Sequence, residues 1–312
     1  MTNSTKTALL FAGQGAQIVG MGKDLAEKFP AAQQWFERAN SALGYDLGQI
    51  CFSGPESELI KTEHAQPAIF LVSWTAWQLL KERVPDLQFG ATAGLSLGEF
   101  TALAAAGTLT FEDGLRLVRQ RGRFMQEACD TTRGTMAAVI GLDETPTREV
   151  CAEADVALAN LNCPGQLVIS GETEKISKAC ELAKAKGARR ALPLTVAGAY
   201  HSPLMASAQS KLSAELNRVT VNSTKVAVIS NVTAQPHGTP ETIRTRLVEQ
   251  VTSSVRWEES IRYLLSQGFN RFIELGPGTA LSGFMKRIDK NVLMLNVADL
   301  ASLETTTASL LG

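Results

Sequence analysis

The stretch Gly94-Leu95-Ser96-Leu97-Gly98 is the part of the sequence that predicts the fold. A run of small residues, 91–93, precedes it, and an Ala-rich, helix-prone run, 101–106, follows it. Strand, tight turn and helix is the setting in which a Gly-x-Ser-x-Gly pattern holds a nucleophile, because the turn raises the serine hydroxyl above a sheet. The flanking glycines remove side chains that would clash there. An ordinary glycine-rich turn is the alternative for so short a pattern.

The composition is that of a globular protein with no strong charge bias. The chain has 312 residues, of which 45% are hydrophobic and 20% charged, with a formal net charge of −1. This charge gives no global argument for a nucleic acid or an anionic membrane as a partner. No apolar run approaches the roughly 18 residues of a membrane span, and the polar segment Met1–Lys6 does not begin a secretory signal. We therefore expect a cytoplasmic protein.

The cysteines give no sign of a metal site or a disulfide framework. They are odd in number and scattered, and no Cys-x-x-Cys pair occurs among Cys51, Cys129, Cys151, Cys163 and Cys180. We expect buried free thiols in a reducing compartment, and no metal.

The first strand leads into a glycine-rich loop. Thr7–Phe11 is a short apolar run typical of a buried strand, and Gly13-Gln14-Gly15-Ala16-Gln17 follows it. Neither a Gly-x-Gly-x-x-Gly spacing nor a Gly-Lys-Ser/Thr ending is present, so the loop does not predict phosphate binding. It is expected at the carboxyl end of a strand, where α/β proteins place their sites.

A small inserted subdomain is predicted in the middle of the chain. From Met136 to Val196 the pattern reads β-α-β-β-α-β, the ferredoxin-like order. Alternating strands and helices resume after it, and helices are also expected at 31–43 and 67–84, with Pro67 at a first helical position. The predicted fold is therefore α/β, with a parallel-sheet body formed by 1–133 and 198–312 and a ferredoxin-like subdomain at 134–197.

Arg121 has an unusual place on its predicted helix. On a helical wheel, the apolar residues of 111–129 share one broad arc, and Arg121 is the only charged residue inside it. A buried arginine needs an anionic partner or several hydrogen bonds. One interpretation is that Arg121 forms a structural salt bridge or extends its guanidinium to solvent. The other is that the guanidinium binds a substrate carboxylate through two hydrogen bonds.

Only three histidines are available as a general base. His237 lies in a Gln-Pro-His-Gly turn and is expected to be exposed, and His64 is expected in a solvated loop before a helix. His201 follows the predicted subdomain, where the chain should return to the main body. It is therefore the candidate partner for Ser96.

Five motifs in order resemble those of the malonyl-CoA:acyl carrier protein transacylases of fatty acid synthesis. The resemblance covers essentially the whole chain and rests on these segments: Gly13–Gln17, Gly94–Phe100, Gln120–Gln126, Tyr200–Met205 and Glu274–Gly278. It implies a hydrolase-like body with a ferredoxin-like insert, and a serine acyltransferase that needs no cofactor. The implied substrates and partners are malonyl-CoA and acyl carrier protein, and the implied state is a monomer.

The resemblance also implies roles for individual residues. Ser96 would carry the malonyl group in a ping-pong transfer, with His201 as its proton acceptor. Backbone amides of Gln14 and Leu97 would form the oxyanion hole. Arg121 would bind the malonyl carboxylate. In this family no aspartate completes a triad, and a backbone carbonyl, here that of Gln250, orients the histidine.

Two positions bear on the shape of the pocket. Leu95 stands where the family usually has a histidine; since that histidine is not the proton acceptor, we expect catalysis to survive. Tyr200 resembles the bulky aromatic residue of malonyl-selective members, which predicts malonyl over methylmalonyl. Two local basic pairs, Arg189-Arg190 and Lys286-Arg287, are candidates for contacts with CoA phosphates or the acidic carrier protein, or else ordinary solvated surface.

Two other functions fit parts of the sequence. A serine esterase or thioesterase would share the Gly-x-Ser-x-Gly motif, but such hydrolases place an acid between serine and histidine, and the histidine near the C-terminus. A non-catalytic acyl-binding subunit would not need Ser96, Arg121 and His201 together. Two observations separate the transferase, the hydrolase and the binding subunit: whether an acyl-enzyme forms, and whether water discharges it quickly.

Overall fold

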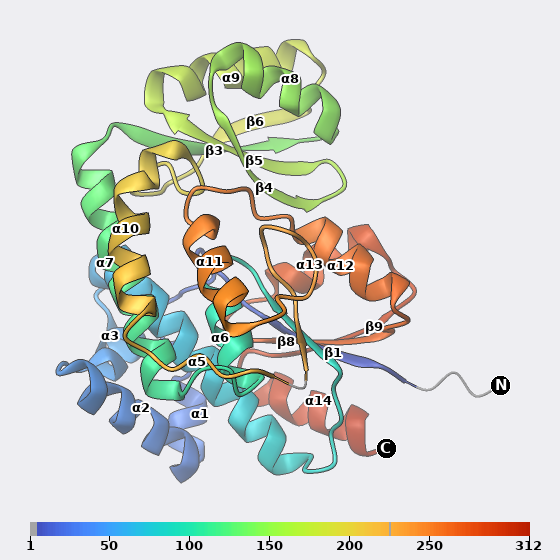
Figure 1. Cartoon of the computed structure of the whole chain (residues 1–312). Helices are drawn as coiled ribbons and strands as arrows, with labels where there is room; N and C mark the ends of the chain where they lie inside the picture. The colour runs from blue at the N-terminus through green and yellow to red at the C-terminus, as the bar shows by residue number, and fades with distance from the viewer. Residues whose placement is uncertain (1–4, 225) are drawn as a thin grey trace.

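Two β-sheets organise the chain (Figure 1). The computed structural model describes residues 5–224 and 226–312, so most of the segment Met1–Lys6 lies outside the described residues. The strands are β1 (Thr7–Phe11), β2 (Ala91–Gly94), β3 (Gly134–Ile140), β4 (Ala157–Cys163), β5 (Gln166–Glu172), β6 (Arg190–Pro193), β7 (Ala227–Val228), β8 (Arg271–Leu275) and β9 (Leu293–Val297).

The larger sheet is parallel and carries the loops of interest at one edge. Its order is β7-β2-β1-β8-β9, and Leu10 of β1 lies between Ala93 of β2 and Glu274 of β8. Every residue of β1 is buried, as expected for a central strand covered on both faces. Because parallel strands end at the same edge, the loops after β1, β2 and β7 meet there.

Helices cover this sheet and complete the body. They are α1 (Lys23–Lys28), α2 (Pro30–Leu43), α3 (Leu47–Ser53), α4 (Glu56–Leu59), α5 (Thr62–Arg83), α6 (Gly98–Ala105), α7 (Phe111–Thr131), α10 (Ala206–Leu216), α11 (Pro240–Gln250), α12 (Trp257–Ser266), α13 (Ala280–Ile288) and α14 (Leu300–Leu311). The sequence analysis did not predict α1, α3, α4, α10 or α14, whose apolar faces are short or weakly periodic.

The smaller sheet is antiparallel and forms a separate lobe at the top of Figure 1. Its order is β4-β5-β3-β6, and helices α8 (Glu144–Ala154) and α9 (Thr173–Ala185) pack on its outer face with a core of their own. The predicted fold class, a parallel-sheet body with a small ferredoxin-like insert, is confirmed. β6 ends at Pro193, three residues before the predicted end. The division of the chain at 134 and 197 into domains stays a prediction.

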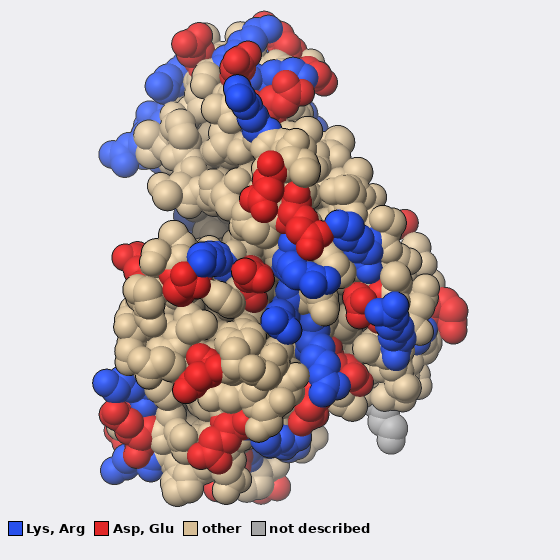
Figure 2. All heavy atoms as spheres, turned by 90° about the vertical axis from the view of Figure 1, so that its left-hand side faces the viewer, with Lys and Arg blue, Asp and Glu red and all other residues tan. Residues whose placement is uncertain are grey.

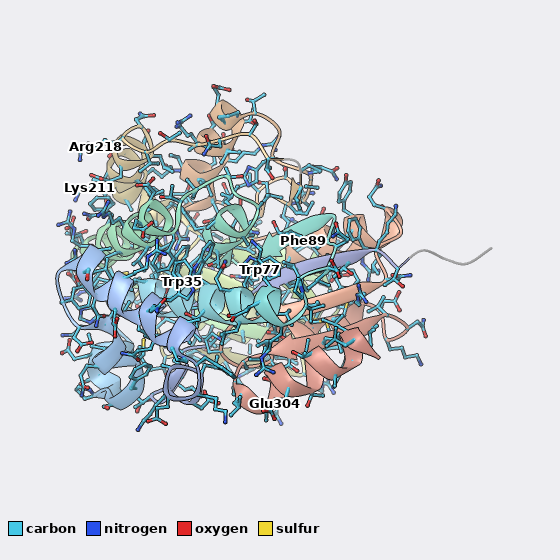
Figure 3. All side chains as sticks on the ribbon, turned by 90° about the horizontal axis from the view of Figure 1, so that it is seen from below. Trp35, Trp77, Phe89, Lys211, Arg218 and Glu304 are labelled. Atoms are coloured by element: carbon cyan, nitrogen blue, oxygen red, sulfur yellow. The ribbon has the colours of Figure 1, made fainter. Side chains whose placement is uncertain are left out.

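Two aromatic contacts help to hold the helices of the body together; Trp35, Trp77 and Phe89 are labelled in Figure 3. Trp77 of α5 packs edge-on against Phe89 with ring centroids 5.2 Å apart, and the ring centroids of Trp35 of α2 and Phe111 of α7 are 4.9 Å apart.

The expected position of Pro67, at the start of a helix, was wrong. It lies inside α5, which begins at Thr62, because the first turn is fixed by tertiary hydrogen bonds between Thr62 and Tyr200 and from Arg121 to Gln66.

No helix in the described part of the chain is long and apolar enough to cross a bilayer. On the face shown in Figure 2, Lys and Arg side chains lie among Asp and Glu side chains. Lys211 of α10 and Glu127 of α7 form an ion pair.

Gly122 sets the distance between α5 and α7, the two helices that bring Gln66 and Arg121 together. A Cβ at this position would lie 2.4 Å from the carbonyl oxygen of Thr62. We predict that Gly122→Ala lowers the free energy of unfolding by about 1–3 kcal/mol, the usual cost of overpacking. Denaturant unfolding measures this change.

Gly283→Ala is the matched control, because Gly283 is exposed on α13 and a Cβ there would meet nothing within 4 Å. This variant should gain about 0.5–1 kcal/mol from helix propensity. Equal behaviour of the two variants would mean that α5 and α7 do not pack as closely as described.

Candidate active site

Ser96 lies on a strained turn directly after β2. Its φ is 53°, in the left-handed region, which costs a residue with a side chain roughly 1–2 kcal/mol. The turn requires both flanking glycines. A Cβ on Gly94 would lie 1.9 Å from the Gly98 carbonyl carbon, and a Cβ on Gly98 would lie 2.3 Å from the Phe11 carbonyl oxygen. The sequence therefore builds the tight turn between strand and helix that the Gly-x-Ser-x-Gly pattern predicts.

Ser96 is hydrogen-bonded to His201. The distance from Ser96 Oγ to His201 Nε2 is 2.8 Å. His201 Nδ1 lies 2.9 Å from the carbonyl oxygen of Gln250 and 3.2 Å from that of Ser253. Since carbonyl oxygens only accept, Nδ1 carries the proton and Nε2 has a free lone pair for the serine hydroxyl. Two backbone carbonyls thus fill the place of the acid in a triad.

Burial keeps His201 neutral. The side chain is 4% exposed, and its desolvation, with the nearby charge of Arg121 in support, lowers the pKa of His201 to about 4. The two backbone carbonyls oppose this shift without cancelling it. At neutral pH the imidazole is therefore ready to accept a proton.

Arg121 reaches the same point from α7, with its guanidinium fully buried. It donates to Ser96 Oγ (3.1 Å), to Gln66 Oε1 (2.8 Å) and to Gln250 Oε1 (3.0 Å). Within the described residues it has no carboxylate in contact, and its Nε has no hydrogen-bond partner. Desolvation lowers the pKa of Arg121 to about 10, opposed by the charge of Glu99, so the cation persists at neutral pH.

Two backbone N–H groups in the loops after β1 and β2 are the candidates for an oxyanion hole. In residues 5–224 and 226–312, neither the Gln14 nor the Leu97 amide has a hydrogen-bond partner. The two loops are in contact, since a Cβ on Gly13 would lie 2.5 Å from the carbonyl oxygen of Leu95. Leu95 itself packs against the core behind the larger sheet.

Tyr200 lies beside the histidine and is buried. Its hydroxyl is 2.7 Å from Thr62 Oγ1, and burial raises the pKa of Tyr200 to about 12.

The two basic pairs that the sequence suggested for substrate contacts are exposed, Arg189-Arg190 on the small lobe and Lys286-Arg287 on α13. Arg287 donates to Gln166 Oε1 and to the Pro164 carbonyl oxygen, at one turn of the small sheet.

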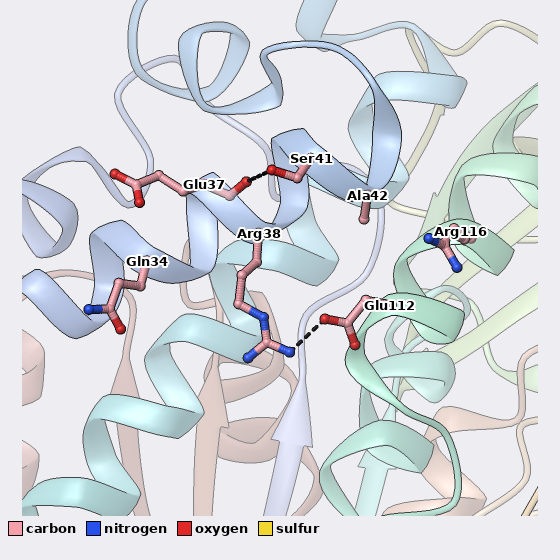
Figure 4. A pocket seen from close by; sticks show the side chains of 7 residues that line it. All are labelled: Gln34, Glu37, Arg38, Ser41, Ala42, Glu112 and Arg116. Carbon is pink, nitrogen blue, oxygen red and sulfur yellow. Dashed lines mark hydrogen bonds and ion pairs between the residues drawn. The ribbon is translucent and has the colours of Figure 1, made fainter.

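A shallow hollow between α2 and α7 is unrelated to these residues (Figure 4). Figure 4 shows Arg38 paired with Glu112 across it, and neither Ser96, His201 nor Arg121 lines it. Its lining mixes both signs of charge, so it does not indicate a particular ligand.

Comparison with known proteins identifies the family. The family model described as "Acyl transferase domain" matches residues 8–304. The chain belongs to the acyl transferase domain family. It is 43% identical to a malonyl CoA-acyl carrier protein transacylase of Bacillus subtilis over 98% of both chains, and 42% identical to that of Escherichia coli K12 over 91% and 93%.

Solved structures of this acyl transferase family are closely similar. The malonyl CoA-acyl carrier protein transacylase of Coxiella burnetii has a TM-score of 0.95 at 36% identity and covers 99% of this chain and 98% of its own. A malonyl-transacylase in complex with a type II PKS acyl-carrier protein has a TM-score of 0.94 at 39% identity, with 98% and 100% covered.

Several residues around Ser96 and Arg121 were missed from the sequence. Gln66, which accepts a hydrogen bond from Arg121, and Asn231, which accepts one from the Ser96 backbone N–H, carry no motif that would have revealed them. Glu99, the only charged residue among the small and apolar residues of α6, was a signal that could have been followed.

Both expectations for the other histidines were wrong. His237 is 3% exposed and contacts the Glu99 carboxylate, because the turn that holds it folds inward over α6. His64 lies within α5 and is half-buried, with its Nδ1 3.0 Å from the Glu58 carbonyl oxygen.

The low pKa of His201 predicts the pH dependence of acylation. The base must be neutral, and its folded-state pKa lies near 4 rather than 6.5, so it loses function only below about pH 5. We expect kcat/KM for the acyl donor to be flat from about pH 5.5 to 7.5. Stopped-flow measurement of acylation across this range tests it, and an acid limb centred near pH 6.5 would contradict the burial argument.

Proposed function

We propose that this chain is a malonyl-CoA:acyl carrier protein S-malonyltransferase that works through a malonyl-serine intermediate. The observation that carries the proposal is the buried guanidinium of Arg121, which touches Ser96 Oγ and has only uncharged hydrogen-bond partners in the described residues. A cation in this position matches an acyl group that ends in a carboxylate. Relatives of this length and similarity bear the name malonyl CoA-acyl carrier protein transacylase.

In the first half-reaction, Ser96 takes the acyl group. His201 Nε2 accepts the Oγ proton while Oγ forms a bond to the thioester carbon of malonyl-CoA. The C–S bond then breaks, and the protonated His201 returns the proton to the departing CoA thiolate. In the second half-reaction, the phosphopantetheine thiol of the carrier protein gives its proton to His201 and attacks the malonyl ester. Ser96 Oγ recovers the proton as it leaves.

The remaining residues support this chemistry. The free amides of Gln14 and Leu97 bind the oxyanion of each tetrahedral intermediate, for which such donors are typically worth a few kcal/mol. The Gln250 carbonyl, together with that of Ser253, holds the Nδ1 proton of His201. Arg121 releases Ser96 Oγ and binds the malonyl carboxylate with its two Nη groups.

Recognition of the rest of the substrates is part of the same proposal. Arg189, Arg190, Lys286 and Arg287 are exposed cations that CoA phosphates or an acidic carrier protein could contact. The proposed setting is fatty acid synthesis in the cytoplasm by a monomer that uses no cofactor. The five buried, unpaired cysteines are in keeping with a reducing compartment.

Intact mass spectrometry tests the proposal. Mixed with malonyl-CoA, the protein should gain the mass of one malonyl group, and Ser96→Ala should gain none. Holo acyl carrier protein should discharge the adduct faster than water does, which separates a transferase from a thioesterase. An adduct that water removes equally fast, or no adduct at all, would overturn the proposal in favour of a hydrolase or a binding subunit.

Selectivity can be tested at Tyr200. We predict that Tyr200→Ser raises methylmalonyl transfer relative to malonyl transfer by about tenfold, because it opens space for a methyl branch, and one methyl group is worth about 1–3 kcal/mol of discrimination. Tyr200→Phe keeps the ring and should keep the malonyl preference. The measurement is competition between the two acyl-CoA donors; an unchanged ratio in Tyr200→Ser would refute the assignment.

A further inference from the structure

A buried contact between a carboxylate and an imidazole adjoins the Ser96–His201 site. Glu99, in the first turn of α6, is fully buried, and its Oε1 lies 2.5 Å from Nε2 of His237, on the loop between β7 and α11. Nδ1 of His237 has no hydrogen-bond partner in the part of the chain that the structure describes. The acyl-transfer scheme above does not use either residue.

The hydrogen bonds assign the protons of this contact. Glu99 Oε2 accepts from the Asn231 backbone N–H (3.0 Å) and from Gln250 Nε2 (2.7 Å). Every neighbour of the carboxylate can donate a hydrogen bond to it. His237 supplies the third donor from Nε2, because a carboxylate oxygen facing it can only accept.

The two groups bound by Glu99 hold the reacting residues. Asn231 accepts from the Ser96 backbone N–H (2.7 Å) and donates to the Gly94 carbonyl (2.8 Å). Gln250 donates from Nε2 to the Ser96 carbonyl (3.0 Å), and its Oε1 accepts from Arg121. One carboxylate thus fixes both amides that secure the strained serine, and also fixes which end of the Gln250 amide faces Arg121.

We propose that Glu99 and His237 are positioning residues for acyl transfer: His237 anchors the Glu99 carboxylate, and Glu99 orients Asn231 and Gln250 so that Ser96 and Arg121 are held for a carboxylate-bearing acyl group. This inference rests on the proposed function. It also explains how Arg121 is buried without a carboxylate in contact, since the Glu99 charge reaches it through the Gln250 amide.

His237 is the better position for a test, because it lies one step further from the reacting atoms. Its backbone is held independently of the ring, by an N–H bond to the Val228 carbonyl and by donors from Thr242 and Arg246 to its own carbonyl. His237→Leu keeps a similar volume and removes the donor, which leaves Glu99 Oε1 buried without a partner. His237→Gln can place an amide N–H near the position of Nε2 and is the conservative rescue.

Acylation of these variants by malonyl-CoA and by acetyl-CoA, in single turnovers of folded protein, tests the inference. Acetyl has no carboxylate, so it reports on Ser96 without Arg121. We expect His237→Leu to lower the malonyl acylation rate by about tenfold, the effect of one hydrogen bond to a charged group, and to lower the malonyl-to-acetyl rate ratio. His237→Gln should recover most of both, and His64→Leu, the matched histidine control outside this network, should equal the wild type.

Two results would overturn the inference. In one, His237→Leu acylates as fast as the wild type; in the other, it lowers thermal stability while the rate per folded molecule and the malonyl-to-acetyl ratio stay unchanged, which is a structural role alone. Failure of the proposed function itself is distinguishable, because the wild type would then form no malonyl adduct.

Discussion

The burial of the Arg121 guanidinium is the constraint on which the rest of the site depends. A charge removed from water must be compensated, and in the described residues this one forms hydrogen bonds only with two glutamine amides and a serine hydroxyl. The nearest compensation is the Glu99 carboxylate, on the far side of the Gln250 amide. Because the Glu99 carboxylate compensates the charge without contacting the guanidinium, no carboxylate of the protein occupies the Arg121 donors. A binding site for a substrate carboxylate requires such donors.

The need to keep Arg121 free of a carboxylate partner also explains why backbone carbonyls, and not an acid, accept from His201. A carboxylate at Nδ1 of His201 would raise the pKa of the imidazole and would also attract Arg121. Backbone carbonyls fix the tautomer without adding a charge. The cost is conformational: Ser96 and His201 both have φ in the left-handed region, at 53° and 57°. Strain of this kind is characteristic of functional sites that the surrounding structure holds in place.

Much of the fold and the centre of the site could be predicted from the sequence, for physical reasons. Central strands such as β1 are apolar throughout, and the arc on α7 that contains Arg121 follows directly from helical periodicity. The order of motifs identified Ser96, Arg121 and His201. Geometry brings these three together, whereas their assigned roles, and those of Gln14, Leu97, Gln250 and Tyr200, stay proposals.

What the sequence could not reveal depends on contacts between distant segments. Gln66 and Asn231 act through single hydrogen bonds that no local pattern marks. A Gln-Pro-His-Gly turn is typical of exposed chain, and only the inward fold over Glu99 makes His237 a core residue. Pro67 was placed at a helix start because propensity alone cannot foresee that contacts from Thr62 and Gln66 extend α5 before it.

The most direct test of the account compares Arg121→Ala with the wild type in single-turnover acylation by malonyl-CoA and by acetyl-CoA. If the guanidinium exists to bind the acyl carboxylate, malonyl acylation should fall by roughly a hundredfold or more, the cost of removing one partner of a buried charge pair. Acetyl acylation should then change little or rise. An equal fall with both donors would contradict the account, and would make Arg121 a structural support for Ser96 instead.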